Sequence, residues 1–350
     1  MDVDTARTLL EAYPEPWLAP HLVDGVREAD AGRLLIVLSF PCGRWAPVLA
    51  GQLARFIERK TGQKVCVGLQ WQVEPQAVQG ALKPYPGIKN IIAVASGKGG
   101  VGKSTVAVNL ALALAAEGAA VGILDADIYG PSQPQMLGVQ GQRPELIENK
   151  AMRPVLAHGI HLMSIGLLID PADPTIWRGP MVTQALQQML TETAWPTLDY
   201  LIIDLPPGTG DTQLSLAQRI PVSGAVIVTT PQEIALLDAR KGLRMFEKVG
   251  VTVLGIVENM AGHTCSQCGH LDPVFAAGGA DRLAQEHGVP VLGQLPLDGR
   301  IGAQADGGEP TVVAESESEL AGRYLALARR AAAALVAAGA AAFPDIVVES

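Results

Sequence analysis

Cysteine and charged residues are both scarce in this chain of 350 residues, and each scarcity excludes a class of protein. Four cysteines are too few to form a disulfide framework in a chain of this length. The longest run of low polarity, residues 331–343, is too short and too rich in alanine to span a bilayer. The acidic start of the chain also lacks the basic and apolar regions of a secretory signal. We therefore expect a cytoplasmic protein with reduced thiols.

The low content of charged residues, 17%, accompanies a hydrophobic content of 48%, which is typical of a folded globule rather than of a disordered chain. The net charge of −9 is concentrated in residues 91–350, which hold 16 lysines and arginines and 26 aspartates and glutamates. An acidic surface of this kind repels nucleic acid and anionic lipid. We therefore expect no nucleic-acid partner and no membrane partner.

The most informative motif is Gly-x4-Gly-Lys-Ser, which runs from Gly97 to Ser104. A β-branched apolar run at 91–94 precedes the motif, and an Ala/Leu-rich helical run at 106–116 follows it. In this strand–loop–helix context the glycines let backbone N–H groups surround phosphates, and the helix N-terminus adds a partial positive charge. The motif therefore predicts a site for ATP.

Individual positions of this loop have distinct predicted roles. Lys103 is placed to reach the β- and γ-phosphates, and the Ser104 hydroxyl is placed to bind Mg²⁺. Lys98, directly after the first glycine, resembles the second lysine of the deviant loop in dimeric ATPases such as MinD, ParA and the nitrogenase iron protein. In those relatives this lysine reaches across the dimer interface to phosphate bound by the other subunit. The predicted loop contacts to ATP are Gly97, Lys98, Gly99, Gly100, Val101, Gly102, Lys103, Ser104 and Thr105.

From residue 91 onward, apolar strand candidates alternate with helical stretches. The candidates are 91–95, 120–125, 160–165, 199–204, 224–229, 252–257 and 290–293. This rhythm predicts the α/β class, a P-loop NTPase with a mostly parallel sheet and helices on both faces. Ligands of such sheets lie beyond the carboxyl ends of the strands, where this chain has Asp127 and Asp204. We expect Asp204 to fix Mg²⁺ through water, Asp127 to orient the attacking water, and residues 206–210 to sense the γ-phosphate.

The first 82 residues have the pattern of a small α/β domain that precedes the ATPase. Helical spacing at 5–12 and 45–59 alternates with strand-like runs at 33–40 and 64–71. Prolines and a glycine predict a linker at 83–90, which leaves 91–345 as the ATPase domain with a closing helix at 319–338. We expect the first domain to be a mobile module that docks a partner and does not catalyse. Cys42 and Cys66 are isolated, and we expect both to be buried free thiols.

A second chemical centre is the Cys-x2-Cys pair formed by Cys265 and Cys268. Two thiolates at this spacing converge on one metal or cluster, but zinc and [4Fe–4S] sites generally need four ligands. A symmetric homodimer would bring two such pairs together on a two-fold axis to share one cluster. Alternatively, His263 and His270 would complete a Cys2His2 zinc site within one chain. A redox dithiol or an inert pair remain further possibilities.

Several long motifs in this chain occur together in one known family. They are residues 96–105, 125–132, 177–181, 204–211 and 257–260, followed in order by the cysteine pair and by Gly278 and Gly279. On these motifs the chain resembles the Mrp/ApbC family of iron–sulfur cluster carrier ATPases over nearly its whole length. The first 80 residues resemble the MIP18-type domain that precedes the ATPase in bacterial members, with Cys42 where that domain often has a cysteine.

The resemblance implies roles for three residues. Asn259 would read the adenine base, and Cys265 with Cys268 would hold a [4Fe–4S] cluster that bridges the two subunits. The chain departs from the family where an aromatic residue usually precedes the first cysteine and a proline lies inside the pair, because His263 and Ser266 occupy these places. His263 could therefore ligate, hydrogen-bond to a cluster sulfur or remain exposed.

These patterns together predict a homodimeric carrier that hydrolyses ATP, accepts a [4Fe–4S] cluster from a donor scaffold and delivers it to apo iron–sulfur proteins. Lys98, Lys103, Asp127 and Asp204 are the predicted catalytic residues, with ATP, Mg²⁺ and the cluster as bound groups. The alternative is a positioning or partition ATPase of the MinD/ParA type with zinc at the cysteine pair. An electron-transfer ATPase like the nitrogenase iron protein is a further rival, although it uses two widely separated cysteines per subunit.

Overall fold

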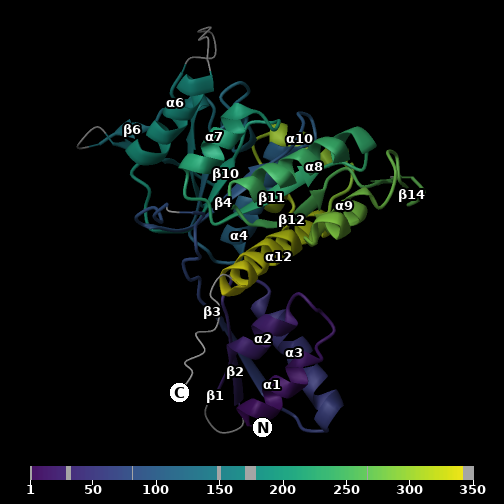
Figure 1. Cartoon of the computed structure of the whole chain (residues 1–350). Coiled ribbons are helices and arrows are strands. Elements are labelled where there is room, and N and C mark those ends of the chain that lie inside the picture. The colour runs from purple at the N-terminus through teal and green to yellow at the C-terminus, as the bar shows by residue number, and fades with distance from the viewer. Residues whose placement is uncertain are drawn as a thin grey trace.

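Two sheets organise the chain, a small one in the N-terminal part and a large one in the remainder (Figure 1). The computed structural model describes residues 2–28, 33–80, 82–147, 151–169, 179–265 and 267–341. Within these residues the large sheet and its helices lie above the small unit in the view of Figure 1, and the long helix α12 (Glu319–Ala341) runs between them.

The N-terminal unit contains a three-stranded sheet and three helices. Its elements are α1 (Val3–Glu11), α2 (Ala19–Gly25), β1 (Val26–Glu28), β2 (Arg33–Leu38), α3 (Ala46–Thr61) and β3 (Cys66–Trp71). α1 begins where the Asp2 carboxylate accepts a hydrogen bond from the Thr5 N–H at 2.8 Å. β2 pairs antiparallel with β1 and parallel with β3, so α3 is the crossover between two parallel strands. The predicted strand–helix–strand pattern is present.

The large sheet has eight strands in the order β15-β12-β11-β4-β10-β5-β9-β8. Its strands are β4 (Ile88–Ala95), β5 (Val121–Asp125), β8 (Val155–Ala157), β9 (Ile160–Ser164), β10 (Leu198–Asp204), β11 (Gly224–Thr229), β12 (Val253–Glu258) and β15 (Val291–Gln294). All neighbouring pairs are parallel except β8 and β9. β11 is buried along its whole length, as expected for a parallel strand covered on both faces. The predicted α/β class is therefore confirmed, with each predicted strand within three residues of its expected start.

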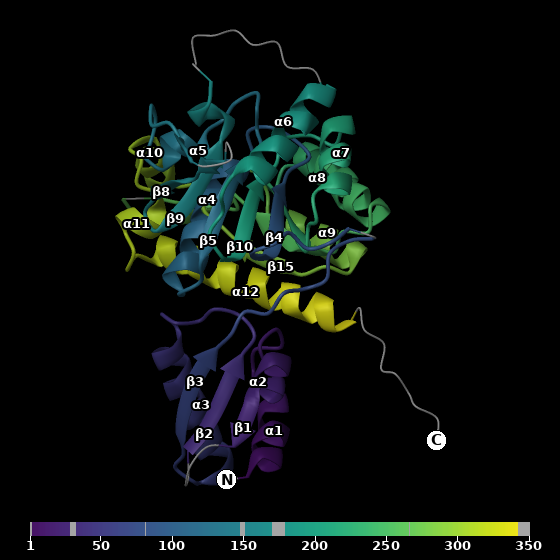
Figure 2. The ribbon, with the colours of Figure 1, turned by 90° about the vertical axis from the view of Figure 1, so that its left-hand side faces the viewer.

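Helices cover both faces of this sheet (Figure 2). They are α4 (Lys103–Ala116), α5 (Gln133–Met136), α6 (Gly179–Glu192), α7 (Asp211–Arg219), α8 (Glu233–Lys248), α9 (Gly279–His287), α10 (Gly299–Asp306), α11 (Thr311–Ala314) and α12. Alternate residues of β4 serve two separate cores. Ile92 and Val94 pack with α4 and α12, whereas Ile91 and Ala93 pack with α6 to α9.

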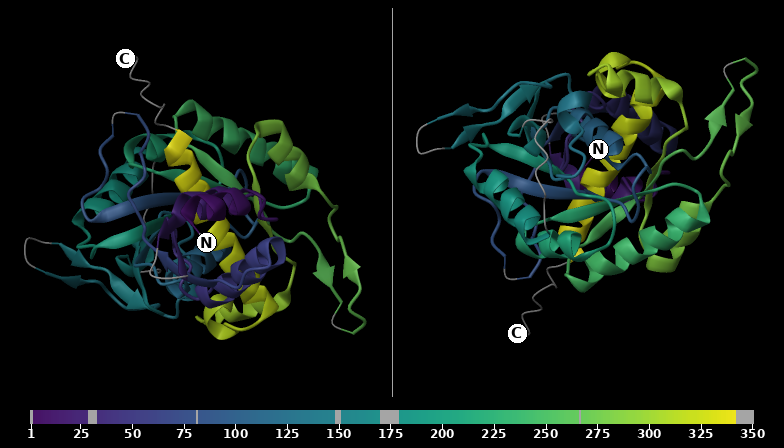
Figure 3. Two further views of the ribbon diagram at one scale, coloured as in Figure 1. Left: turned by 90° about the horizontal axis from the view of Figure 1, so that it is seen from below. Right: turned by 90° about the horizontal axis from the view of Figure 1, so that it is seen from above.

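Two short hairpins project from the body of the large domain in both views of Figure 3. One pairs β6 (Glu145–Leu146) with β7 (Met152–Arg153), and the other pairs β13 (His263–Thr264) with β14 (Leu271–Asp272). Sequence reasoning did not identify these strands, because two-residue strands are too short to show a periodicity. A 3₁₀ turn at Ile165–Leu167 follows β9.

The N-terminal unit packs tightly against α12 and the end of α4. Glu117, which follows α4, is fully buried, and its carboxylate accepts a hydrogen bond from Arg329 in α12 at 2.5 Å and one from the Trp45 N–H at 3.1 Å. The Arg329 guanidinium also lies over the Trp45 ring at 4.6 Å, and the Glu117 carbonyl accepts from the Gly43 N–H. One continuous apolar core includes side chains from the small unit, α4 and α12. The boundaries 1–82, 83–90 and 91–345 stay a prediction.

The two isolated cysteines differ in their surroundings. Cys42 is fully buried, and burial raises the pKa of its thiol to about 12. Cys66 is exposed at the start of β3, so the expectation that it is buried was wrong. The side chain of Cys66 points to the solvent side of the small sheet, because alternate residues of this strand face opposite sides and Val67 is the buried neighbour.

Replacing Glu117 with alanine is expected to lower the free energy of unfolding by about 3–5 kcal/mol, because the largely buried Arg329 would lose its counter-ion. Urea unfolding of the full chain measures this loss. Glu145→Ala is the matched control, since Glu145 and Arg153 form an ion pair that is more than half exposed, and its removal costs no more than about 1 kcal/mol. Equal losses in the two variants would contradict a structural role for the buried pair.

Candidate functional site

The nucleotide loop, residues 97–105, joins the carboxyl end of β4 to the start of α4. Gly100 and Gly102 have φ angles of 81° and 82°, in the left-handed region that favours glycine. α4 begins at Lys103, so the N–H groups of its first turn have no partners within the helix and are available to a ligand in the loop. This is the geometry of an anion site at a helix N-terminus.

Two neighbours fix the position of the loop. A Cβ atom at Gly97 would collide with the backbone of Asp238 in α8, and one at Gly102 would collide with the Asn259 amide. The Asn259 side chain donates a hydrogen bond from Nδ2 to the Val101 carbonyl at 2.9 Å. In this structure Asn259 therefore supports the loop, and its contact with adenine stays a prediction.

Three of the four predicted catalytic side chains, those of Lys103, Asp127 and Asp204, meet beside the loop. Lys103 forms an ion pair with Asp204, and its Nζ atom lies 3.9 Å from Asp127 Oδ2. Lys103 Nζ also donates to Ser104 Oγ at 3.1 Å. β10 lies between β4 and β5 in the sheet, and Asp204 at its end stands directly opposite Asp125. The topology therefore brings residues about 100 positions apart into one cluster.

Sequence reasoning missed three polar residues that surround these carboxylates. Gln133 is fully buried and donates from Nε2 to Asp204 Oδ2 at 2.9 Å and to the Ser104 carbonyl at 3.1 Å. Asp125 Oδ2 accepts from the Gln133 N–H at 3.1 Å and from Ser164 Oγ at 3.0 Å. Asp125 could have been predicted from the sequence, because it is an acidic residue at the end of a buried strand. Gln133 and Ser164 carry no such signal, because only tertiary packing brings them to the site.

The carboxylates of the cluster carry more negative charge than one lysine balances. Burial raises the pKa of Asp125 to about 7, and the neighbouring Asp204 carboxylate adds to this rise. Burial also raises the pKa of Asp127, although the Lys103 ammonium opposes the change. Buried oxygen donors with an excess of negative charge fit Mg²⁺. Ser104 and Asp204 are the residues that would hold the ion, the carboxylate acting through water.

Lys98 lies outside this cluster. Its side chain is exposed and forms no ion pair with the residues that the structure describes, while its carbonyl accepts from Ser96 Oγ at 2.9 Å. The Ser96 carbonyl accepts from the Gly208 N–H at 3.0 Å, and the Gln213 side chain donates to the Pro206 carbonyl. Ser96 thus connects the segment after β10 to the nucleotide loop through backbone groups, and the Lys98 side chain stays free to reach outward.

The cysteine pair lies on the projecting hairpin of β13 and β14 (Figure 3). The Cys265 N–H donates to the His270 carbonyl, and the Gly269 N–H donates to the Cys265 carbonyl, both at 2.9 Å. Cys268 is exposed and Cys265 is partly exposed. Hydrogen bonds from the N–H groups of Gln267 and Cys268 lower the pKa of the Cys265 thiol. The turn therefore presents two accessible thiols, one of which ionises easily.

The Cys2His2 zinc arrangement is not formed by the described residues, since they contain no group of three or more His, Cys, Asp or Glu side chains that could hold a metal ion. His263 Nδ1 instead lies 3.0 Å from the Leu297 carbonyl, an interaction that ties the root of the hairpin to the chain after β15. Ser266 lies outside the described residues, as do Trp177 and Arg178 of the family motif at 177–181. The hairpin thus supplies two thiols and no visible histidine ligand.

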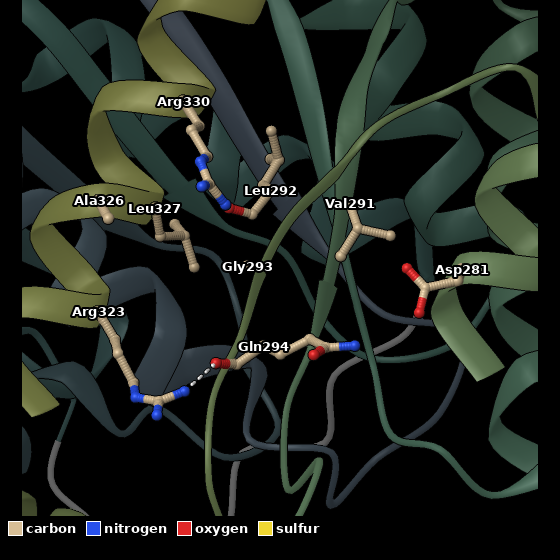
Figure 4. Close-up of a pocket in the computed structure, with 9 residues that line it drawn as sticks. All are labelled: Asp281, Val291, Leu292, Gly293, Gln294, Arg323, Ala326, Leu327 and Arg330. Atoms are coloured by element: carbon tan, nitrogen blue, oxygen red, sulfur yellow. Dashed lines mark hydrogen bonds between the residues drawn. The ribbon is translucent and has the colours of Figure 1, made fainter. Parts of the chain in front are cut away.

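A separate hollow of about 430 Å³ lies at the edge of the large sheet, between β15, α9 and α12 (Figure 4). Arg323 and Arg330 donate hydrogen bonds at 3.4 Å to the carbonyls of Gln294 and Leu292, and Asp281 lies on the opposite side. It contains no predicted site residue. The guanidinium groups cover carbonyls on the edge strand, which discourages pairing with another chain.

A glycine loop between a central parallel strand and a helix, with its lysine against an aspartate on the neighbouring strand, defines a P-loop NTPase. The family model described as ParA, NUBPL iron-transfer P-loop NTPase, matches residues 87–332. The chain belongs to this family. The predicted resemblance to iron–sulfur cluster carriers is confirmed.

Known relatives agree with this assignment. The iron–sulfur cluster carrier protein of Salmonella typhimurium is 54% identical over 310 residues, which cover 87% of this chain and 83% of the relative. The iron–sulfur cluster transfer protein NUBPL of Mus musculus is 53% identical over 248 residues, or 70% of this chain and 77% of the relative. A nucleotide-binding protein of Archaeoglobus fulgidus, solved in complex with ADP and with cobalt, has a TM-score of 0.58 and 39% identity, over 67% of this chain and 91% of its own.

Among the described residues, every helix is too short or too polar to cross a bilayer.

Proposed function

We propose that this chain works as a homodimer that hydrolyses ATP, binds one [4Fe–4S] cluster between its subunits and transfers it to apo iron–sulfur proteins. The cluster is cargo, received from a donor scaffold. The observation that carries this proposal is the pairing, in one chain, of an assembled nucleotide site with an exposed hairpin of only two thiols. Two chains related by a two-fold axis would supply the four thiolates that a [4Fe–4S] cluster needs.

Hydrolysis would proceed by attack of water on the γ-phosphate, in line with the leaving oxygen. Asp127, partly buried beside Lys103, is positioned to orient the water, and Lys103 would neutralise charge on the β- and γ-phosphates. When bound, Mg²⁺ would supply further neutralisation. The segment after β10 is hydrogen-bonded to Ser96, directly before the loop, so that γ-phosphate contacts could move both together.

A transfer assay tests the proposal directly. The full chain is reconstituted without oxygen, and its iron, sulfide and zinc are measured together with its Mössbauer spectrum. It is then mixed with an apo-protein whose activity requires a [4Fe–4S] cluster. We expect about four iron atoms per dimer and recovery of activity in the recipient. Zinc at one atom per chain, with no cluster formed, would overturn the proposal.

Lys98→Ala is expected to abolish ATP hydrolysis while retaining most of the nucleotide affinity, because the exposed Lys98 would act on the partner's phosphates. Mixing Lys98→Ala chains with Asp127→Ala chains tests this action in trans. In an equal mixture about half of the dimers would be mixed, and each mixed dimer would contain one complete site out of two. The mixture should therefore recover about a quarter of wild-type hydrolysis. Each variant alone is the control, and a mixture as inactive as its components would contradict the assignment.

The alternative is a positioning ATPase of the MinD/ParA type with zinc at the cysteine pair, although positioning itself requires neither Cys265 nor Cys268. The named functions of the relatives from Salmonella typhimurium and Mus musculus support the carrier instead. We also infer a cytoplasmic location, because all four cysteines are free thiols. The acidic charge of residues 91–350 supports the absence of nucleic-acid and membrane partners.

A further inference from the structure

The outer face of α8 carries a row of cations. Lys241, Arg244 and Lys248 follow one another at spacings of three and four residues, so they lie on one side of the helix. They line a hollow of about 350 Å³ with Thr209, Gly210, Leu214 and Met245. This basic groove, as we call it, lies between α8 and α7, which are neighbours in Figures 1 and 2. Its floor is apolar and its rim is cationic.

The cations of the basic groove are poorly neutralised by the protein itself. Lys241 has one acidic neighbour, Asp238, at 2.9 Å, and two-thirds of the Lys241 side chain remains exposed. Arg244 and Lys248 form no ion pair with the described residues. Arg240, on another side of the same helix, is by contrast engaged in a bidentate pair with Glu286. Arg244 and Lys248, the two cations of α8 without an ion pair among the described residues, therefore both line the groove.

Cations are rare elsewhere in this part of the chain. Residues 91–350 contain 16 lysines and arginines, and four of these lie within residues 240–248. A concentration of positive charge on an otherwise acidic domain attracts a partner of opposite charge by electrostatic complementarity.

The basic groove adjoins the nucleotide site on two sides. Thr209 and Gly210 belong to the segment after β10, in which the Gly208 N–H bonds to Ser96, the residue directly before the nucleotide loop. In the N-terminal half of α8, the backbone of Asp238 is in close contact with Gly97 of the loop. A partner in the groove would therefore contact elements that border the ATP site without touching the catalytic cluster.

We propose that the basic groove binds an acidic segment of a partner protein. This inference rests on the proposed function in one respect, since a carrier needs a surface where donor or recipient proteins dock. From Lys241 to Lys248 the helix rises about 10 Å, which suits several carboxylates along a peptide better than one phosphate group. The apolar floor of Leu214 and Met245 suits the aliphatic parts of such a segment.

A binding experiment on the full chain tests the groove. The probe is a fluorescein-labelled ten-residue peptide with glutamate and leucine at alternating positions, and anisotropy reports its binding at low and high salt. The variant Arg244→Glu/Lys248→Glu should bind the peptide at least about tenfold more weakly than the wild type. The control Lys64→Glu/Lys83→Glu makes the same charge change at exposed residues outside the groove and should bind within about twofold of the wild type.

Other outcomes are equally decisive. Equal losses in variant and control, or binding that high salt does not weaken, would overturn the proposal. Displacement of the peptide by inorganic phosphate or by a single-stranded oligonucleotide at lower concentration than by unlabelled peptide would assign the groove to those ligands instead. If the charge reversal prevents folding, Arg244→Gln/Lys248→Gln gives a smaller loss in the same direction.

The experiment also separates this proposal from the proposed function. The groove variant should retain ATP hydrolysis and the iron content of the wild type, because neither residue belongs to the nucleotide or cysteine site. If the wild-type chain binds the peptide normally but holds no cluster, the proposed carrier function is wrong and the groove proposal stands. If the wild-type chain transfers clusters normally but shows no specific peptide binding, the groove proposal alone is wrong.

Discussion

ATP hydrolysis by the Lys103→Ala variant is expected to fall by roughly a thousandfold or more, to the limit of detection. The Lys103 ammonium is the one cation within 4 Å of both Asp204 and Asp127 among the described residues, and 5% of its side chain is exposed. Without it the γ-phosphate would approach buried carboxylates with no fixed positive charge to balance it. Release of inorganic phosphate from ATP at saturating Mg²⁺ measures the effect.

The same substitution should leave the cysteine hairpin intact, because no described contact joins the two sites. Iron content after reconstitution is therefore the internal control, and it should equal that of the wild type. Lys241→Ala provides a matched lysine substitution on α8, away from the catalytic cluster, and should hydrolyse ATP normally. Hydrolysis by Lys103→Ala within about tenfold of the wild type would show that another group neutralises the phosphates.

Loss of the cluster is the expected result for Cys265→Ala and for Cys268→Ala. Each variant removes two of the four thiolates from the proposed dimer, and two thiolates cannot hold a [4Fe–4S] cluster in place of four. Iron should fall from about four atoms per dimer to the background level, with ATP hydrolysis retained. Iron and sulfide analysis after anaerobic reconstitution measures the change.

The chain offers two controls for the cysteine experiment. Cys66 is exposed like Cys268 but lies on the small sheet, so Cys66→Ala should keep its full iron content. Cys42→Ala should also keep its iron, because the raised pKa of this buried thiol disfavours the thiolate that a cluster requires. One zinc per chain that disappears in His263→Ala or His270→Ala would falsify the bridging arrangement and support the intrachain zinc site.

The nucleotide site was predictable where its signals are local. The loop at 97–105 and the strand-end residues Asp127 and Asp204 follow from short patterns, because parallel strands align their carboxyl ends at one edge. Gln133 carries no such pattern, and its contact with Asp204 joins residues 71 positions apart. Asn259 was assigned to adenine through the family resemblance, whereas the structure adds its bond to Val101.

The relation between the two sheets was not predictable in the same way. A linker rich in proline and glycine at 83–90 suggests independence, but the buried Glu117 and its partners Arg329 and Trp45 join three distant parts of the chain. Nothing in the local sequence around Glu117 distinguishes it from an exposed helix-end glutamate. Cys66 shows the same limit, since the direction in which a strand residue points depends on which side of the sheet is covered.

The two ends of α4 contact different parts of the molecule. Lys103 and Ser104 occupy its first turn, and Glu117 follows its last, so the 14 residues of α4 span about 21 Å from the phosphate site to the N-terminal unit. A helix of this length bends little without breaking its own hydrogen bonds, so an axial displacement at one end arrives at the other. A displacement of the loop on ATP binding would therefore also move Trp45 and Gly43. The small unit would then change its position according to which nucleotide is bound.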